Sequence, residues 1–322
     1  MIVCIGVVKN AADMIESMVR GNSVWADQFV FYDNMSTDRT AAILDSLRRE
    51  GLPIEVLPDT EQSHLQKEKM QKLIRYVVDK YSPGFLIALD DDEILCSNRE
   101  DLRPEEIGEA IQSLDRDSLY YISWRNYIPT EEDDPQVICV PERFRFCFDD
   151  EPEMTKKVLI PAKILTDDFT IADGNHYADG SKIKKRVHLA DLRIAHYPVR
   201  SPQQIASKAV VGWMNNLTMP EREQGLNYHW ERMYRSVRDG GLPSVDLMQA
   251  MCTLYRENPN DEEHLNVVCR PIRLPEKCME LKYTSGKEVN LFRNICFEME
   301  ALAESCAKYR REMEAEQEKK NL

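Results

Sequence analysis

The first hundred residues alternate short apolar runs with helical patterns, and this alternation constrains the fold more than any other feature. Continuous apolar runs such as residues 2–8 are typical of strands that are covered on both faces. The expected strands are residues 2–8, 29–32, 54–57 and 85–89, and the expected helices are residues 11–20, 40–49 and 64–81. This order predicts an α/β fold with a mostly parallel sheet flanked by helices.

The rest of the chain reads differently. Between about residues 119 and 196 the pattern favours strands, over residues 119–128, 137–148, 158–164, 187–189 and 192–196. From residue 201 helices dominate, and Ser201 and Pro202 are typical of an N-cap followed by a first helical residue. We therefore expect an α/β region over residues 1–200 that carries the functional site, and a helical region over residues 201–322.

The C-terminal tail from Asn290 predicts one long helix. Apolar residues recur along it every three or four positions, at Leu291, Ile295, Met299, Leu302, Cys306, Tyr309 and Met313. Such spacing resembles a coiled-coil seam. The helix either packs on its own domain or pairs with the tail of a second copy in a homodimer.

Net charge excludes one class of partner. Lysine and arginine total 42 against 56 aspartates and glutamates, which gives a formal net charge of −14. A surface this acidic repels phosphate backbones, so we expect no nucleic-acid partner. It also disfavours broad adhesion to anionic lipid.

Cysteine use and the N-terminus indicate a compartment. The nine cysteines form no CxxC pair, and most lie in apolar runs, as Cys4 does. We expect buried thiols in a reducing compartment. The opening MIVCIGVVKN lacks the basic region of a signal peptide, and no apolar run reaches the ~18 residues of a membrane span. The sequence thus predicts a cytoplasmic protein without a span; peripheral association with a membrane is compatible with this pattern.

The strongest chemical feature is an acidic cluster directly after the strand at 85–89. It consists of Asp90, Asp91, Asp92 and Glu93. Ligands of parallel sheets bind beyond the carboxyl ends of the strands, and clustered carboxylates at such an end need a positive partner. Oxygen ligands suit Mg²⁺ or Mn²⁺, which leave positions open for substrate phosphates. The alternative interpretation is a solvated acidic turn.

A second polar segment follows the strand at 29–32. Asp33 stands at the strand end, where a carboxylate can accept hydrogen bonds from a base or a ribose. Thr37 or Asp38 can cap the next helix. Read alone, half of this segment is capping chemistry.

These segments together resemble family 2 glycosyltransferases of the GT-A fold. The residues that carry the resemblance cover roughly positions 1–215. The opening MIVCIGVVKNAADMIESMV resembles the family's first strand and "KNE…IE" stretch, and FVFYDNMSTDRTAAILDSL resembles its "DNGSTDGT" segment. FLIALDDDEIL resembles the "LDADEF" form of the DxD motif, and the later motifs of the family resemble YISWRNYI, VPERFRF, KKVLIPAKI, GNHY and IAHYPVRSPQQIASKAVVGW. Three positions depart from the family. Ala11 replaces a usual glutamate, and Met35 and Arg39 replace glycines.

The resemblance implies a nucleotide site and a metal site. Asp33 would contact the nucleotide, with uracil expected, and Val8 and Lys9 would flank it. Asp90 and Asp91 would join the nucleotide-binding residues, with Asp90 at the ribose or at a metal-bound water. Asp92 would bind Mn²⁺ or Mg²⁺ and bridge it to the diphosphate, whose departing charge the ion neutralises. Glu93 would support the site or begin a helix.

Histidines would complete the metal site, as they often do in metal-dependent members of the resembling family. His196, at the end of the strand at 192–196, is the first choice, and His176 is the second. Imidazole suits Mn²⁺ better than Mg²⁺. The competing interpretation of each is a capped or buried structural histidine.

Family 2 enzymes are inverting, so the resemblance also implies a base that deprotonates the attacking hydroxyl. The loop at 172–181 carries Asp179 and Asp173, and we place Asp179 first. The acidic stretch at 149–151 is an alternative. Arg200 and Lys208, in the HYPVRS…SK segment, are candidates to hold the diphosphate. The other local basic residues could hold it too, with solvated surface charge as the competing interpretation: Lys156, Lys157, Lys184, Lys185 and Arg186.

The sequence thus favours an inverting glycosyltransferase that moves a sugar from a UDP-sugar donor to a glycan, lipid-linked or polysaccharide acceptor. One alternative is a nucleotidyltransferase that makes activated sugars, although VVKNAADMIE lacks the glycines of its usual loop. Another is a degenerate, non-catalytic scaffold, against which the complete acidic cluster argues.

Overall fold

The computed structural model describes residues 1–61, 65–149, 155–218, 228–256, 266–275 and 280–320. Within these residues, nine strands form one sheet in the order β3-β2-β1-β4-β8-β6-β12-β5, with β11 also paired to β6. The strands are β1 (Ile2–Val8), β2 (Gln28–Asp33), β3 (Ile54–Pro58), β4 (Phe85–Ala88), β5 (Glu93–Ser97), β6 (Ser118–Asn126), β8 (Lys156–Pro161), β11 (Lys185–His188) and β12 (Leu192–His196). Most neighbours run parallel, and β8 and β5 are the antiparallel members.

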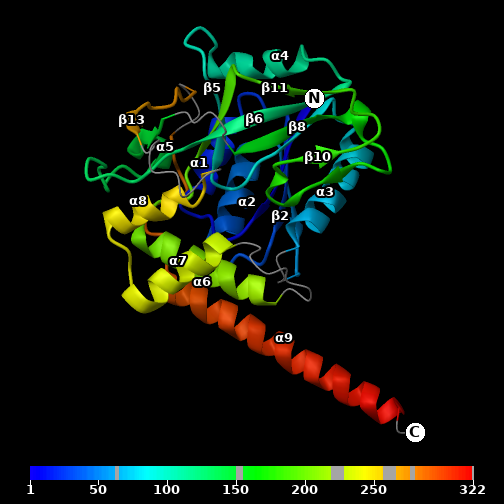
Figure 1. Cartoon of the computed structure of the whole chain (residues 1–322), viewed down its shortest axis with the longest axis vertical. Coiled ribbons are helices and arrows are strands. Elements are labelled where there is room, and N and C mark those ends of the chain that lie inside the picture. Colours follow the sequence, from blue (N-terminus) through cyan, green and yellow to red (C-terminus); the bar gives the residue numbers. More distant parts are fainter. Residues whose placement is uncertain (62–64, 150–154, 219–227, 257–265, 276–279, 321–322) are drawn as a thin grey trace.

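Helices cover both faces of this sheet (Figure 1). The helices of the described residues are α1 (Ile15–Asn22), α2 (Thr40–Glu50), α3 (Gln66–Tyr81), α4 (Ile107–Gln112), α5 (Val140–Arg143), α6 (Pro202–Leu217), α7 (Tyr228–Gly240), α8 (Val245–Thr253) and α9 (Leu291–Lys320). The predicted fold class is confirmed: an α/β protein with a mostly parallel, Rossmann-like sheet and a helical C-terminal extension.

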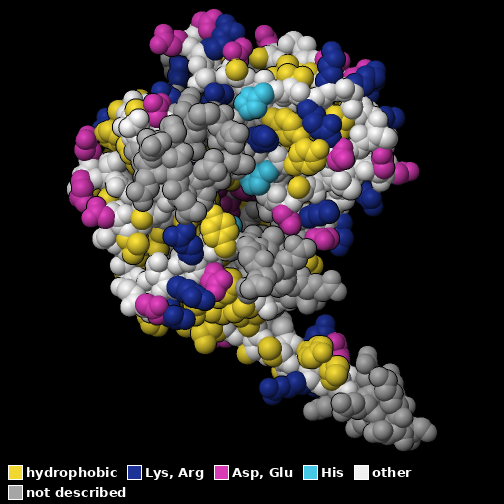
Figure 2. Space-filling model, in the orientation of Figure 1, with side chains coloured by type: hydrophobic (Ala, Val, Ile, Leu, Met, Phe, Trp, Pro, Cys, Tyr) yellow, Lys and Arg dark blue, Asp and Glu magenta, His cyan; other side chains and the backbone are white. Residues whose placement is uncertain are grey.

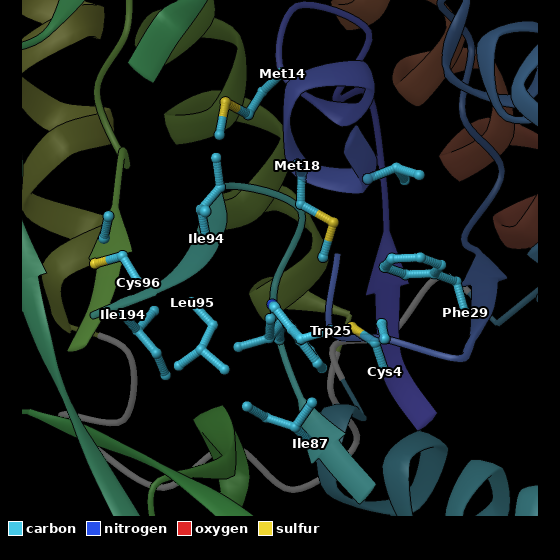
Figure 3. Packing of buried hydrophobic residues seen from close by; sticks show 14 of the residues in the cluster. Cys4, Met14, Met18, Trp25, Phe29, Ile87, Ile94, Leu95, Cys96 and Ile194 are labelled. Carbon is cyan, nitrogen blue, oxygen red and sulfur yellow. The ribbon is translucent and has the colours of Figure 1, made fainter. Parts of the chain in front are cut away.

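The core has two layers because successive strand residues point to opposite faces. On one face, Cys4, Phe29 and Ile87 pack with α1 and α2, and Met18 of α1 belongs to the same cluster (Figure 3). On the other face, the alternate strand residues pack against the apolar side of α3. This double burial explains why β1 and β4 read as continuous apolar runs rather than as alternating ones.

A glycine sets the spacing between the sheet and the acidic cluster. A Cβ atom on Gly6 in β1 would overlap the carbonyl oxygen of Leu89. The Leu89 N–H in turn donates to the carbonyl oxygen of Ile5 at 3.0 Å. The chain that leaves β4 can therefore approach β1 closely, and the carboxylates that follow Leu89 begin beside the end of β1.

Several boundaries differ from the sequence prediction. The first helix begins at Ile15 rather than residue 11, since residues 11–14 form a turn. The strand predicted over 137–148 is wrong: the short helix α5 and the strand β7 (Phe146–Phe148) replace it. Pro141 explains this, because proline fits the first turn of a helix and cannot donate to a sheet. The strand predicted over 158–164 ends at Pro161 in a 3-10 turn.

The helical region packs against one end of the sheet. Ser201 caps α6 as predicted, since its hydroxyl accepts from the Gln204 N–H at 3.1 Å. Helices α6, α7 and α8 share a third apolar cluster that includes Ile205, Met233 and Met251. The strand β13 (Val267–Cys269) returns to pair with β7. Helix α9 leaves this body and extends away from it (Figure 1).

Two further expectations concern membranes and thiols. Among the described residues, no helix combines the length and apolar character that crossing a membrane requires. The expectation of buried cysteines holds for some of them and not for others. Cys4, Cys96, Cys139, Cys147 and Cys252 are buried, whereas Cys269, Cys296 and Cys306 are exposed. Cys278 lies outside the described residues.

Candidate functional site

A cavity of about 590 Å³ opens at the carboxyl end of β1 and β4. Its floor includes the acidic residues Asp90, Asp91 and Asp92, and its opposite wall comes from α6 and α7. In Figure 2 histidine side chains lie close to a recess in the middle of this face. The cavity therefore sits where parallel sheets bind their ligands.

Backbone contacts fix the acidic turn. The Asp90 N–H donates to Glu93 Oε2 at 2.8 Å, which closes the turn on itself. The Tyr197 N–H donates to the carbonyl oxygen of Asp92 at 2.9 Å, and Glu93 pairs in register with His196 across β5 and β12. The turn thus joins the end of β4 to the end of β12, so that two distant segments meet at one point.

Glu93 and Asp90 share a buried lysine. Lys157 Nζ lies 2.7 Å from Asp90 Oδ2 and 3.4 Å from Glu93 Oε1, and the Lys157 side chain is fully buried. Burial raises the pKa of Glu93 to about 8, although the charge of Lys157 lowers it. Lys157 therefore neutralises the inner side of the cluster, and Glu93 supports the turn instead of facing the cavity.

Asp92 meets two cations from the helical region. Its Oδ2 lies 2.6 Å from Lys208 Nζ and 3.4 Å from a nitrogen of Arg200. Burial alone would raise the pKa of Asp92, but Lys208, His196 and Arg200 hold it well below its ordinary value. Arg200 is itself bound by Asp13, at 2.7 and 2.9 Å. Asp92 is therefore ionised, with one oxygen committed to these cations.

The other oxygen of Asp92 faces His196. Nε2 of His196 lies 3.6 Å from Asp92 Oδ1. Nδ1 of the ring is 2.7 Å from Asn126 Oδ1, an amide oxygen that can only accept, so Nδ1 carries the proton. Burial lowers the pKa of His196 to about 3, and the ring stacks on Trp124. His196 is thus neutral and turns an unprotonated Nε2 toward a carboxylate.

This pair fits a divalent cation better than it fits a hydrogen bond. A carboxylate oxygen and an imidazole lone pair facing each other repel unless a positive group lies between them, and both are Mn²⁺ ligands. Within the described part of the chain, no group of three or more histidine, cysteine or acidic residues is arranged to hold a metal. Two protein ligands suffice where substrate phosphates and water complete the coordination, as is usual for Mg²⁺.

Asp91 stands apart from these ion pairs. Its Oδ2 accepts a hydrogen bond from the backbone N–H of Lys9 at 3.2 Å, and it lines the cavity. Burial and the charge of Asp92 raise the pKa of Asp91 to about 7. The three consecutive aspartates therefore have three environments: Asp90 faces Lys157, Asp91 faces the end of β1, and Asp92 faces α6 and His196.

His176 lines the same cavity but is held by a different element. Its Nδ1 is 2.7 Å from the carbonyl oxygen of Lys156 at the start of β8 and donates to it. The ring meets the edge of Trp124, with centroids 5.0 Å apart. Burial, followed by the charge of Lys157, lowers the pKa of His176 to about 4. The structure brings His196, and not His176, into contact with Asp92.

The strand ends place two predicted nucleotide residues beside the cavity rather than on its wall. Val8 is buried in the core, and its neighbour Val7 lines the cavity. Asp33 accepts from the Ser36 N–H at 3.1 Å, while the adjacent Asn34 reaches the wall. Lys9 lines the cavity as expected. The side-chain period of two explains both one-residue differences.

The two base candidates are separated. Asp173 lines the cavity, and its Oδ1 accepts from the Lys67 N–H at the start of α3 at 3.0 Å. Asp179 lies outside the cavity wall, where it pairs with Arg186 at 2.6 Å and is 66% exposed. In the alternative stretch, Asp149 pairs with Arg270 at 3.2 Å, and residues 150 and 151 lie outside the described residues.

Sequence reasoning missed part of the cavity wall. Polar residues of α3 and tyrosines of the helical region line it without having been singled out: Gln66, Lys69, Tyr228 and Tyr255. The ring of Trp230 in α7 lies on the same wall. Gly212 in α6 makes room for one of these rings, because a Cβ there would lie 2.8 Å from Trp230 Cε3. A glycine inside a helical pattern was the only signal of this packing in the sequence.

Comparisons with known proteins add little. No family model matches the chain, and no curated protein matches it. Similar solved structures include the mannosyltransferase PcManGT from Pyrobaculum calidifontis in complex with GDP-Man and Mn²⁺, with a TM-score of 0.38, 11% identity, and coverage of 79% of this chain and 75% of that chain. A mycobacterial protein has a TM-score of 0.33, 12% identity and 76% coverage of each chain. At these values neither likeness bears on function.

Proposed function

We propose that this chain is an inverting glycosyltransferase that uses a nucleoside-diphosphate sugar and a divalent cation. The observation that carries the proposal is the pairing of Asp92 with His196 on the floor of a large cavity, with Lys208 on the other carboxylate oxygen. Asp92 and His196 suit a metal cation, and Lys208 suits an anion, so the site matches an anionic ligand that binds together with a metal ion. A diphosphate with Mn²⁺ or Mg²⁺ is such a ligand.

In this proposal the charged residues divide the work. Asp92 and His196 hold the cation, which when bound neutralises charge on the departing diphosphate. Lys208 is 27% exposed and lines the cavity, so its ammonium can meet a diphosphate oxygen directly. Asn34, Lys9 and Asp91 line the part of the cavity nearest the strand ends, where the nucleoside would bind.

The transfer itself needs a base. The acceptor hydroxyl oxygen would form a bond to the anomeric carbon while the bond from that carbon to the diphosphate breaks. The nucleoside diphosphate leaves with the electron pair, and the hydroxyl proton passes to a carboxylate. Of the two expected bases, Asp173 lies on the cavity wall, and we assign this role to it. The acceptor is proposed to be a glycan, lipid-linked sugar or polysaccharide.

A panel of nucleotides with and without Mn²⁺ tests this function. Thermal unfolding of the full chain would be followed with UDP- and GDP-sugars, the free diphosphates and the triphosphates. We expect the diphosphates and their sugars to raise the melting temperature in the presence of Mn²⁺. Stabilisation by triphosphates alone would favour the nucleotidyltransferase instead. A chain that responds to none of them would support the scaffold interpretation.

A further inference from the structure

In the part of the chain that the structure describes, helix α9 contacts the body near its start. Asn294 donates to the Ser207 hydroxyl at 3.0 Å, and Glu298 pairs with Lys9 at 3.1 Å. Beyond Leu302, every side chain that the structure describes, over residues 303–313, is exposed. Figure 1 shows this part of the helix pointing away from the body. Most of the stability of helices in proteins comes from packing an amphipathic face, so a partner on this segment would stabilise it.

The exposed helix carries a regular apolar seam. Its positions are Phe292, Ile295, Met299, Leu302, Cys306, Tyr309 and Met313, with spacings that alternate strictly between three and four residues. Phe292 is 81% exposed, and Met299 and Tyr309 are each 63% exposed. The structure thus corrects the predicted seam at its first position, where the exposed Phe292 replaces Leu291. Three uninterrupted heptads of this kind are typical of a coiled coil.

Charge on this segment favours a protein partner over a lipid surface. Between Met299 and Met313 three glutamates stand against one lysine and two arginines, so the segment is neutral although the whole chain carries −14. A neutral segment has no excess of basic residues that would attract it to anionic lipid. It also lets a second, equally acidic copy approach here without repulsion along the seam.

We propose that two copies of this chain associate through α9 as a parallel, in-register coiled coil. In that arrangement each seam residue meets its own counterpart, and all of the layers from Phe292 to Met313 are filled. In an antiparallel pair, each first (a) heptad position of one helix would meet a fourth (d) position of the other. The seam has four a positions, which begin at Phe292, and three d positions, which begin at Ile295, so one a position on each helix would have no partner. Among the residues whose side chains the structure describes, the flanking positions oppose no like charges, since Glu298 faces Ala303 and Ser305 faces Arg310. This inference is independent of the proposed transfer reaction.

Sedimentation of the full chain tests the association. We expect a dimer for the wild type and at least a tenfold weaker dimer for Tyr309→Glu, which places a charge in the seam. Ala307→Glu adds the same charge on the outer side of the same helical turn and should leave the dimer intact. Both sites are exposed and beyond the body contacts, so neither variant should alter the fold.

Cross-linking at Cys306 tests the register. In a variant with Cys269, Cys278 and Cys296 changed to serine, a short bis-maleimide should join Cys306 to the partner's Cys306 in high yield. A monomeric wild type, or a dimer that Tyr309→Glu leaves unchanged, would overturn the proposal. A dimer without the Cys306 cross-link would overturn the parallel register. A monomer whose seam binds neutral lipid vesicles would assign the seam to a membrane.

Discussion

His196 presents its unprotonated Nε2 to Asp92 across 3.6 Å, while Asn126 accepts the Nδ1 proton on the other side of the ring at 2.7 Å. The amide therefore fixes the tautomer that a metal ligand requires. Changing such an outer partner usually lowers metal affinity about 10- to 100-fold. We expect Asn126→Leu to raise the Mn²⁺ concentration needed for nucleotide binding by a factor in this range, measured by calorimetric titration of Mn²⁺ at fixed UDP or GDP.

His176→Gln is the matched control for that experiment. His176 lies against the same tryptophan, Trp124, but is oriented by the Lys156 carbonyl rather than by the acidic cluster. It should titrate with Mn²⁺ as the wild type does. The assignment of His196 is contradicted if the two variants shift the titration equally.

Lys208 is expected to act on the diphosphate. Its ammonium lies 2.6 Å from Asp92 and its side chain lines the cavity, so it can stabilise charge that develops as the sugar leaves. Removing one such group typically costs about 10²–10³ in kcat. We expect Lys208→Met to lower kcat by this factor in an assay of released nucleoside diphosphate. Lys184→Met, which changes an exposed lysine paired with Asp117, should turn over normally.

The base assignment separates two aspartates of one loop. Asp173 lines the cavity and Asp179 pairs with Arg186 outside it. Loss of a general base costs about 10²–10⁴ in rate. Asp173→Asn should therefore reduce kcat strongly, with little change in donor binding, whereas Asp179→Asn should remain active. The reverse order of the two rates would return the base to Asp179.

Acid should weaken the attachment of the C-terminal segment. The buried Glu16 in α1 accepts backbone N–H bonds from Lys282, Tyr283 and Thr284 at 2.7–2.9 Å. Burial alone would raise the pKa of Glu16, but these bonds lower it below its ordinary 4.5. Arg20 and Lys282 likewise lower the pKa of Glu50 to about 2. These carboxylates stabilise the fold fully at a pH above their pKa in the unfolded chain. The stabilisation is lost as the pH falls through their lower pKa in the folded protein.

Glu16→Gln should then reduce the free energy of unfolding by about 3 kcal/mol at pH 7, as breaking a buried ionic network does. The difference in unfolding free energy between the variant and the wild type should narrow as the pH falls below about 4.5, where the carboxylate of the unfolded chain gains its proton. It should be small once the pH is below the lowered pKa of Glu16 in the folded protein. Urea denaturation between pH 7 and pH 3 measures both quantities. A gap that stays constant across this range would show that the carboxylate charge plays no part.

Much of the sheet was predictable, because buried parallel strands leave a plain signal. The pattern located β1 to β4, β6 and β12, and it placed the acidic cluster after β4. The family resemblance, rather than this pattern, singled out Arg200 and Lys208, and both line the cavity. The pattern did not show which of two adjacent residues turns its side chain toward the cavity. Val7 rather than Val8, and Asn34 rather than Asp33, line it. A run that is apolar on both faces gives no sign of which side a residue takes.

The pattern did not reveal which residues from distant segments of the chain form ion pairs with the acidic cluster. Lys157 reads as one of several surface lysines, and only the pairing of β8 with β4 and β6 brings it, fully buried, between Asp90 and Glu93. The tail shows a related limit. Periodicity alone could begin its seam at Leu291, whereas the exposure of Phe292 and the contacts of Asn294 with the body decide which face is free.

Asp92 and His196 are proposed to hold a divalent cation together with a nucleoside diphosphate. Calorimetry of UDP and GDP binding, with Mn²⁺ or with EDTA, tests it most directly on the wild type and on Asp92→Asn. We expect binding that requires Mn²⁺ in the wild type and is lost in Asp92→Asn, whose melting temperature should stay near that of the wild type. Binding of equal strength in EDTA, or in Asp92→Asn, would contradict it.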